Sequence, residues 1–307
     1  MLASVLATFL FATSSVTARQ SIQRLGSSSA NILRLLVAAS LLGLYAHLWG
    51  VGFQGPSLPW FLLSGVIGYG VCDTALFMAL PRLGARLTSL MVQCLAVPVA
   101  AATEWLWLGT RLGPREILAS LTILAGVTVA LLPDQRRVEP KGTGKTLRPG
   151  FMAFVFGGIA AVGQGLGAVI SKHGQSLSRE AGFPIDPFSV SYQRIVAGVV
   201  FGGVWWWIQF RRNTLDRPPA VAIRQNPGVP TLVWVLINGL SGPCLGVAAY
   251  QWALKHEPTG VVLSVTSLTP VAVIPISRWI DGDRASRRSL IGGAVAVAGV
   301  VALALNR

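Results

Sequence analysis

Charge is scarce in this sequence. Only 12% of its 307 residues are Asp, Glu, Lys or Arg, about half the fraction found in a typical soluble domain. Hydrophobic residues make up 52% of the chain, and the mean hydropathy is +0.61. The apolar runs recur along the whole length and do not form a single tail or anchor. The composition therefore argues against a soluble protein and predicts a chain that crosses a membrane many times.

Cysteine and histidine are also rare, with three residues of each. Cys72, Cys94 and Cys244 fall inside apolar runs, and no two of them have the C-x-x-C spacing of a redox or zinc site. The histidines do not form an H-E-x-x-H motif or join a cluster of carboxylates. We therefore expect no metal site and no cofactor.

Two motifs of soluble and membrane enzymes are incomplete here. The triplet Gly144-Lys145-Thr146 resembles the end of a phosphate-binding loop, but Glu139 occupies the position of that motif's first glycine. Residues 239–242 read G-x-S-G, like the nucleophile motif of rhomboid proteases, but no histidine base lies on a later helix. We therefore predict neither an ATP site nor a protease.

The formal net charge is +14, and the Lys and Arg residues lie between the apolar runs. In a soluble protein such an excess would suggest nucleic acid as a partner. Between membrane segments, the same residues anchor helix ends to anionic lipid headgroups. We therefore expect a lipid bilayer as a partner and no nucleic acid.

Ten apolar segments match the roughly 20 residues that a helix needs to cross a bilayer core. They run over residues 2–18, 35–54, 60–80, 87–108, 116–133, 150–171, 188–210, 230–254, 260–280 and 289–305. The fold class that we predict is an all-α polytopic membrane protein with ten transmembrane helices.

An internal repeat divides the chain into two halves. A constant offset of 174 residues (234 − 60) relates Trp60 to Trp234, Gly65 to Gly239, Gly68 to Gly242 and Ala75 to Ala249. The halves are residues 1–133 and 150–307, joined by a polar linker over 134–149. Each half holds five predicted helices, and an odd number reverses the direction of the second half. We therefore expect two inverted five-helix repeats, a common transporter design.

Residues 97–132 and 269–305 share an order of features: a helix containing proline, a short turn with glycine and charge, and a glycine-rich helix. With the 5+5 duplication, this order resembles the drug/metabolite transporter superfamily, specifically its EamA-like ten-helix carriers. The resemblance covers nearly the whole chain. It implies a secondary transporter, not an enzyme, with both termini in the cytoplasm.

Asp73 is the one carboxylate in the run 60–80, which has no cationic residue. An acid at the centre of a lipid-facing helix costs about 3 kcal/mol, so we expect Asp73 to face the interior of the bundle. There it can bind a cationic group of a substrate or carry a coupling proton. The alternatives are an internal ion pair with Arg34 or Arg194, or a less buried position.

Other polar and aromatic residues inside the predicted helices are candidates for the same substrate cavity. They are Tyr69, Gln93, Gln164, Tyr250, Gln251 and Ser267. Tyr69 shares a helical face with Asp73 through its i,i+4 spacing, and Tyr250 lies on the corresponding face of the second half. Each of them alone also fits an ordinary hydrogen bond between helices.

The function that these features predict is secondary active transport of a small metabolite or drug, as exporter or importer. Transport would proceed by alternating access around a midplane cavity between the two repeats. The alternatives are an integral membrane enzyme acting on a lipid-linked substrate, and a non-transporting membrane scaffold or sensor. The compact connectors fit a multi-pass protein of the plasma membrane, and specifically a bacterial inner membrane.

The positive-inside rule and the family resemblance predict opposite orientations of the termini. Most Lys and Arg residues lie in the odd-numbered connectors, which the positive-inside rule places in the cytoplasm, with both termini outside. The family resemblance implies that both termini lie inside.

Overall fold

The computed structural model describes residues 1–109, 113–131, 151–212, 214, 228–280 and 287–305. Every regular element in these residues is a helix, which confirms the predicted all-α class for the described part of the chain. The predicted linker over 134–149 lies outside the described residues.

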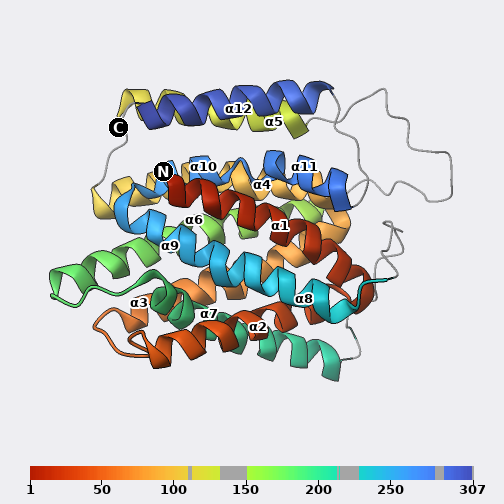
Figure 1. The fold of residues 1–307 in the computed structure, drawn as a ribbon, viewed down its shortest axis with the longest axis vertical. Helices are drawn as coiled ribbons and strands as arrows, with labels where there is room; N and C mark the ends of the chain where they lie inside the picture. Colours follow the sequence, from red (N-terminus) through yellow and green to blue (C-terminus); the bar gives the residue numbers. More distant parts are fainter. Residues whose placement is uncertain (110–112, 132–150, 213, 215–227, 281–286, 306–307) are drawn as a thin grey trace.

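In the described residues, six helical elements precede the predicted linker and eight follow it. The first six are α1 (Leu2–Leu25), α2 (Ser27–Leu48), α3 (Leu58–Gly65), η1 (Val66–Cys72), α4 (Asp73–Leu108) and α5 (Pro114–Leu131). The next eight are α6 (Phe151–Glu180), α7 (Pro187–Arg211), α8 (Thr231–Gly239), η2 (Leu240–Gly246), α9 (Val247–His256), α10 (Thr259–Thr266), α11 (Thr269–Ile280) and α12 (Arg287–Leu305). Figure 1 shows the helices with their axes broadly aligned, α5 and α12 at one edge of the bundle and α2 and α7 at the other.

Local sequence explains several helix ends. Gly26 separates α1 from α2 with a φ of 79°, a backbone conformation that L side chains rarely adopt. The Asp186 carboxylate caps α7 by accepting hydrogen bonds from the backbone N–H groups of Phe188 and Ser189, each at 3.0 Å. Pro187 follows at the first helical position, where its missing N–H removes no helical hydrogen bond.

Seven stretches of helix in the described residues are long and apolar enough to cross a membrane. They are Leu2–Leu25, Ser27–Leu48, Leu58–Ala79, Met91–Leu108, Phe151–Glu180, Thr231–His256 and Thr259–Ile280. The other three predicted segments also form helices, α5, α7 and α12, but none of them is both long and apolar enough to join this set, and α7, with 25 residues, is long but less apolar. In α7 the polar residues Gln193, Arg194 and Gln209 lower the hydropathy, and all three are buried.

One predicted boundary is wrong. We expected a connector between the segments 60–80 and 87–108, but helical structure continues through it as α4, from Asp73 to Leu108. Four of the six connecting residues, Arg82, Leu83, Ala85 and Arg86, favour helix and outweigh Pro81 and Gly84.

Two π-helical segments, η1 and η2, interrupt equivalent helices of the two halves. Their bounds, 66–72 and 240–246, differ by the same 174 residues as the sequence repeat. A π-helical segment widens one turn of a helix and frequently occurs at a functional site. Both segments lie next to the arginines of α2 and α7, and glycines fix those contacts.

Gly65 and Gly239, just before the π-helical segments, form reciprocal close contacts. A Cβ atom on Gly65 would collide with the backbone carbonyl oxygen of Arg194, and one on Gly239 would lie 2.9 Å from the backbone oxygen of Arg34. Each glycine therefore lets one arginine-bearing helix approach the opposite half of the chain closely. The two arginines are thereby held at the centre of the bundle.

A second reciprocal contact joins α5 and α12 at the edge of the bundle. A Cβ atom on Gly126 would overlap the backbone of Ala296, and one on Gly299 would lie 2.9 Å from the backbone nitrogen of Ile123. These two helices therefore pack backbone against backbone, side by side (Figure 1).

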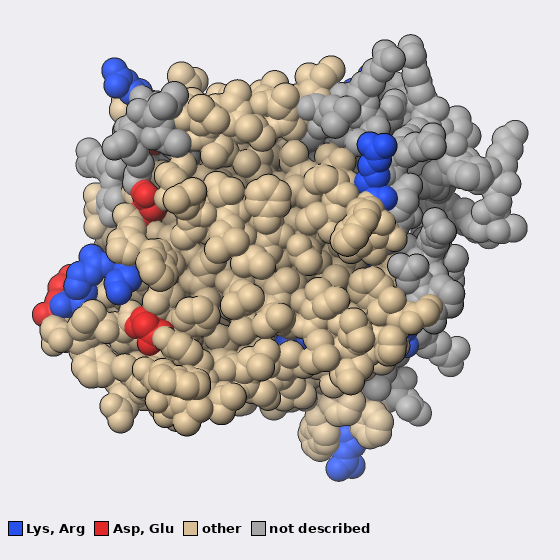
Figure 2. Space-filling view, in the orientation of Figure 1, with Lys and Arg blue, Asp and Glu red and all other residues tan. Residues whose placement is uncertain are grey.

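The molecular surface is apolar between the ends of the helices. On the face in Figure 2, Lys, Arg, Asp and Glu gather toward the two ends of the helices and leave a broad uncharged middle. Large apolar side chains are exposed on many helices of the molecule, for example Leu44 at 59%, Val200 at 62% and Leu232 at 64%. A surface of this size and character is suited to lipid tails rather than to water.

Candidate functional site

A central cavity of about 180 Å³ opens between helices of both halves. Roughly 10 to 15 Å³ of such space holds one water molecule, so the cavity can take a small solute. Its lining comes from α1, α2, η1, α4, α6, α7, η2, α9 and α11. The lining residues are Phe11, Ser14, Ser15, Arg34, Gly68, Tyr69, Cys72, Asp73, Gln93, Gln164, Arg194, Gly242, Pro243, Val247, Tyr250 and Thr269.

Asp73 lies in this cavity and is paired with Arg34. Nη2 of Arg34 donates to Oδ2 of Asp73 at 2.5 Å, and Nε of Arg34 donates to Oδ1 of Asn31 at 2.9 Å. The Arg34 guanidinium also lies 5.1 Å from the ring centre of Phe77. The ion pair with Arg34, one of the two pairings left open by the sequence, is therefore present. A role for Asp73 as a ligand or proton carrier stays a prediction.

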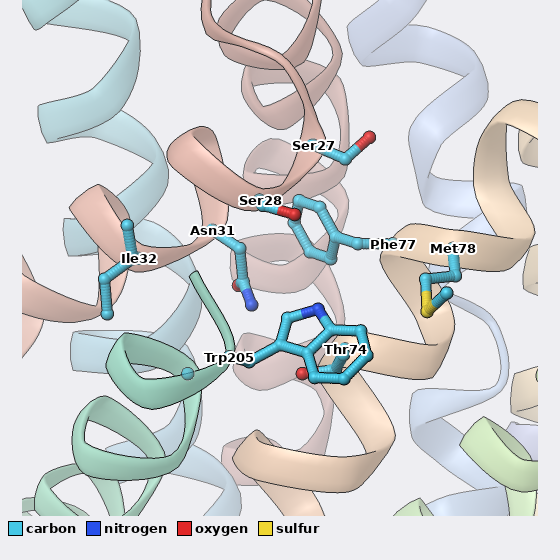
Figure 3. Close-up of a pocket in the computed structure, with 9 residues that line it drawn as sticks. Ser27, Ser28, Asn31, Ile32, Thr74, Phe77, Met78 and Trp205 are labelled. Atoms are coloured by element: carbon cyan, nitrogen blue, oxygen red, sulfur yellow. The ribbon is translucent and has the colours of Figure 1, made fainter. Parts of the chain in front are cut away.

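A narrow cleft lies next to this ion pair, because Asn31 and Phe77, which contact Arg34, also line it. Figure 3 shows residues of α2, α4 and α7, among them Asn31, Phe77 and Trp205, around a cleft of only about 10 Å³. That volume is at the limit for a single water molecule. Arg34 therefore has its carboxylate partner, an amide and an aromatic ring around it, and the neighbouring cleft is too small for a solute.

Arg194 occupies the other side of the cavity and has a different environment. It is 5% exposed, and among the described residues no acceptor bonds its Nε or Nη1 atoms. Its guanidinium lies 5.6 Å from the ring centre of Tyr69, a distance suited to a cation–π contact. The cavity thus contains one arginine with a carboxylate partner and one with no such partner in the described part of the chain.

Five of the seven predicted site residues line the cavity: Asp73, Tyr69, Gln93, Gln164 and Tyr250. Nε2 of Gln164 donates to Oε1 of Gln93 at 2.9 Å, which joins α6 to α4 at the cavity wall. The hydroxyls of Tyr69 and Tyr250 are buried, and neither has a hydrogen-bond partner among the residues that the structure describes. Unpaired buried hydroxyls are costly, so both are available to a bound solute.

The other two predicted residues, Gln251 and Ser267, are fully buried outside the cavity lining. Gln251 follows Tyr250 by one residue, about 100° around the helix, and its Oε1 accepts hydrogen bonds from Ser171 and Gln175 at 2.8 Å each. The Ser267 hydroxyl donates to the Ser264 carbonyl at 2.7 Å. The structure gives both residues the interhelical or local hydrogen bonds that the sequence also allowed.

Sequence reasoning missed the contribution of the first helix and the direct lining role of the arginines. Phe11, Ser14 and Ser15 of α1 face the cavity, and the Phe11 and Tyr250 rings lie 6.1 Å apart. Their only signal in the sequence is a pair of serines in an apolar helix. Arg194 carried a clearer signal, because it is a cation within the predicted membrane segment 188–210.

The second buried carboxylate, Glu104, belongs to a separate structural cluster. It is 2% exposed, and its oxygens accept from Nζ of Lys172 and from the backbone N–H of Thr259, each at 2.7 Å. The described residues hold no group of three or more His, Cys, Asp or Glu that could bind a metal ion. The geometry therefore assembles a binding cavity and brings no second carboxylate to it.

Comparison with known proteins gives one family. The sequence model of the EamA-like transporter family matches residues 1–132 and again residues 151–305. An uncharacterized protein of Pseudomonas aeruginosa is 38% identical over 119 residues, which span 38% of this chain and 40% of that protein. The match thus covers less than half the length of that relative.

A solved crystal structure has the same fold. It superposes on 99% of this chain and 96% of its own chain, with a TM-score of 0.72 at 19% sequence identity. At this identity the likeness concerns the arrangement of the helices alone. The family match and the seven apolar helices together indicate a multi-pass membrane protein.

Proposed function

The chain belongs to the EamA-like transporter family, whose sequence model covers nearly all of it, and from this premise we propose that it is a secondary active transporter. It moves a small solute across the membrane by alternating access, with the central cavity as the binding site. The single observation that carries this proposal is the cavity itself, because both halves of the chain line it. Members of such a family are transporters rather than enzymes, so we propose no enzymatic activity.

The architecture that we propose is ten transmembrane helices in two inverted repeats, residues 1–133 and 150–307. The reciprocal contacts of Gly65 with Arg194 and of Gly239 with Arg34 support this proposal, because each half offers the same glycine to the other half's arginine. Equivalent contacts across a pseudo-two-fold axis allow one half to rock against the other around a fixed site.

The roles that we propose within the cavity follow from the side chains that line it. Tyr69, Gln93, Gln164 and Tyr250 contact the solute, and Asp73 is the candidate for a coupling proton or cation once its contact with Arg34 opens. We place the transporter in the plasma membrane of a bacterium, in line with its relative from Pseudomonas aeruginosa.

Cys72 offers a direct test of alternating access, because its side chain lines the cavity. A variant that keeps Cys72 and carries Cys94→Ser and Cys244→Ser is placed in right-side-out and inside-out membrane vesicles. A membrane-impermeant methanethiosulfonate reagent is then added from outside. We expect labelling of Cys72 in both kinds of vesicle, because the cavity opens to each side in turn. The measurement is intact-protein mass spectrometry of the labelled chain.

The matched control is the same chain with Cys72→Ser, which should take up no label. Because Cys72 is only 3% exposed, a second variant carries Gln164→Cys in the cysteine-free chain, at a less buried position of the lining. Labelling of both positions from one side of the membrane alone would contradict alternating access.

A further inference from the structure

The charged residues that line the cavity are unbalanced. They are two arginines, Arg34 and Arg194, and one carboxylate, Asp73. Because Arg34 and Asp73 pair with one another, the remaining formal charge is the positive charge of Arg194. A cavity with this balance repels a cationic solute and attracts an anionic one.

We propose that the transported solute is a small organic anion and that Arg194 binds its carboxylate or phosphate group. This inference rests on the proposed function, because it names the class of solute that the transporter carries. It also reverses the expectation from the sequence that Asp73 binds a cationic group, since Arg34 already occupies that carboxylate.

The internal repeat explains why Arg194 has no carboxylate. Arg34 on α2 corresponds to Arg194 on α7, and their backbones make the same contacts with Gly239 and Gly65. The offset of 174 residues relates Asp73 to Val247 (73 + 174), and Val247 lines the same cavity. The second half therefore keeps the arginine and replaces its partner by an apolar side chain.

A buried guanidinium without an acceptor is unfavourable, and this points to a ligand. Arginine carries five N–H donors in a planar fork that matches the oxygens of a carboxylate or phosphate. Nε and Nη1 of Arg194 have no acceptor in the described part of the chain, and the buried hydroxyls of Tyr69 and Tyr250 also lack partners. All three side chains line one cavity, so one anionic group can satisfy several of them together.

The rest of the lining suits a solute with an apolar or aromatic body. The rings of Phe11, Tyr69 and Tyr250 form part of the wall, and the cavity volume is about 180 Å³. An inorganic anion would leave most of this space unfilled. We therefore expect an organic anion with a compact ring or chain, its charged end at Arg194 and its apolar end against the aromatic walls.

Four probes with the same phenyl ring test the charge preference. They are phenylacetate, phenyl phosphate, the neutral phenylacetamide and the cationic phenethylamine, with inorganic phosphate as a fifth probe without a ring. Each is added to the detergent-purified protein, and the Tm is measured over a range of concentrations, because a ligand that binds the native state raises the Tm. We expect a saturable rise with phenylacetate or phenyl phosphate, a smaller one with inorganic phosphate, and none with the amide or the amine.

Variants of Arg194 and Val247 test the site. Arg194→Gln should weaken binding of the anion by about 30-fold or more, and Arg194→Lys by less, because lysine keeps the charge without the fork. Val247→Asp should recreate in the second half the ion pair of the first and abolish the Tm rise. Val247→Asn, uncharged and of similar size, should weaken binding less than Val247→Asp. Arg179→Gln, at an exposed arginine at the end of α6, is the control outside the cavity and should bind like wild type.

The outcomes separate this inference from the proposed function, because Tm reports binding without transport. The inference is overturned if neither organic anion raises the Tm, if phenethylamine or phenylacetamide raises it as much, or if Arg194→Gln and Arg194→Lys bind like wild type. Anion binding that depends on Arg194, with both Cys72 and the cysteine of Gln164→Cys labelled from one side only, would support the anion site and contradict alternating access. Labelling from both sides without any anion binding would support alternating access and contradict the anion site.

Discussion

Arg34 and Arg194 are equivalent positions of the two halves with opposite environments. Both are buried, at 9% and 5% exposure, and both lie on a helix held close by a glycine of the opposite half. Arg34 has a carboxylate, an amide and an aromatic ring around it, whereas Arg194 lines the cavity with two buried nitrogen atoms, Nε and Nη1, that have no acceptor in the described residues. The two halves thus place equivalent cations at the centre, and the difference between Asp73 in the first half and Val247 in the second means that only Arg34 of the two forms an ion pair in the described residues.

The largest effect should come from the ion pair of the first half. Asp73→Asn leaves the Arg34 guanidinium buried beside a neutral group, and we expect a loss of about 3 kcal/mol in the free energy of unfolding. The measurement is unfolding of the purified protein in detergent, followed by tryptophan fluorescence. Arg194→Gln is the matched variant in the second half, and we expect it to keep or raise the free energy of unfolding, because it removes an unpaired charge.

The double variant Asp73→Val with Val247→Asp tests whether the position of the carboxylate decides which of the two arginines is paired. It moves the carboxylate to the second half, so it should regain much of the stability lost in Asp73→Val alone. Equal destabilisation by Asp73→Asn and Arg194→Gln, with no recovery in the double variant, would contradict the view that Arg34 depends on a carboxylate partner and Arg194 does not.

A smaller effect should come from the glycines that position the arginines. Gly65→Ala forces a Cβ atom into the backbone oxygen of Arg194, whereas the same atom at Gly239 lies 2.9 Å from the Arg34 oxygen. We expect a loss of about 1–3 kcal/mol for Gly65→Ala and a smaller one for Gly239→Ala. The Tm values of the two variants test the order. Gly158→Ala, where a Cβ atom meets nothing within 4 Å, is the control and should change stability little.

The smallest effect on stability should come from the two cavity tyrosines, one from each half. Tyr69→Phe and Tyr250→Phe each remove a buried hydroxyl that has no partner in the described residues, so the free energy of unfolding should change by less than about 0.5 kcal/mol. Binding of phenylacetate, measured by titration calorimetry, should weaken by about fivefold if the hydroxyl donates to the anion. A clear loss of stability in either variant would mean that the removed hydroxyl forms a hydrogen bond that stabilises the folded protein.

Much of the fold was readable from the sequence because membrane helices follow simple rules of length and hydropathy. The run 60–80, for example, appears as the apolar stretch Leu58–Ala79, and the run 230–254 as Thr231–His256. The connector after Leu80 was not predictable, since short Leu-, Ala- and Arg-rich linkers suit both a turn and a continued helix. Within the site, Tyr69 and Tyr250 were found because mid-helix polar groups must face the interior, but Gln251 faces its neighbouring helix instead.

The sequence by itself determined the helical class and the repeat, and it predicted that Asp73 faces the interior of the bundle, because a bilayer is unfavourable for an exposed charge. Only the tertiary structure decided which arginine receives the carboxylate. An ion pair depends on the approach of α2 to the start of α4 within hydrogen-bond distance, and helical periodicity within one segment does not specify how distant segments meet. In the second half Arg194 and Val247 line the cavity and no carboxylate of that half does so among the described residues, which leaves the site with a positive charge.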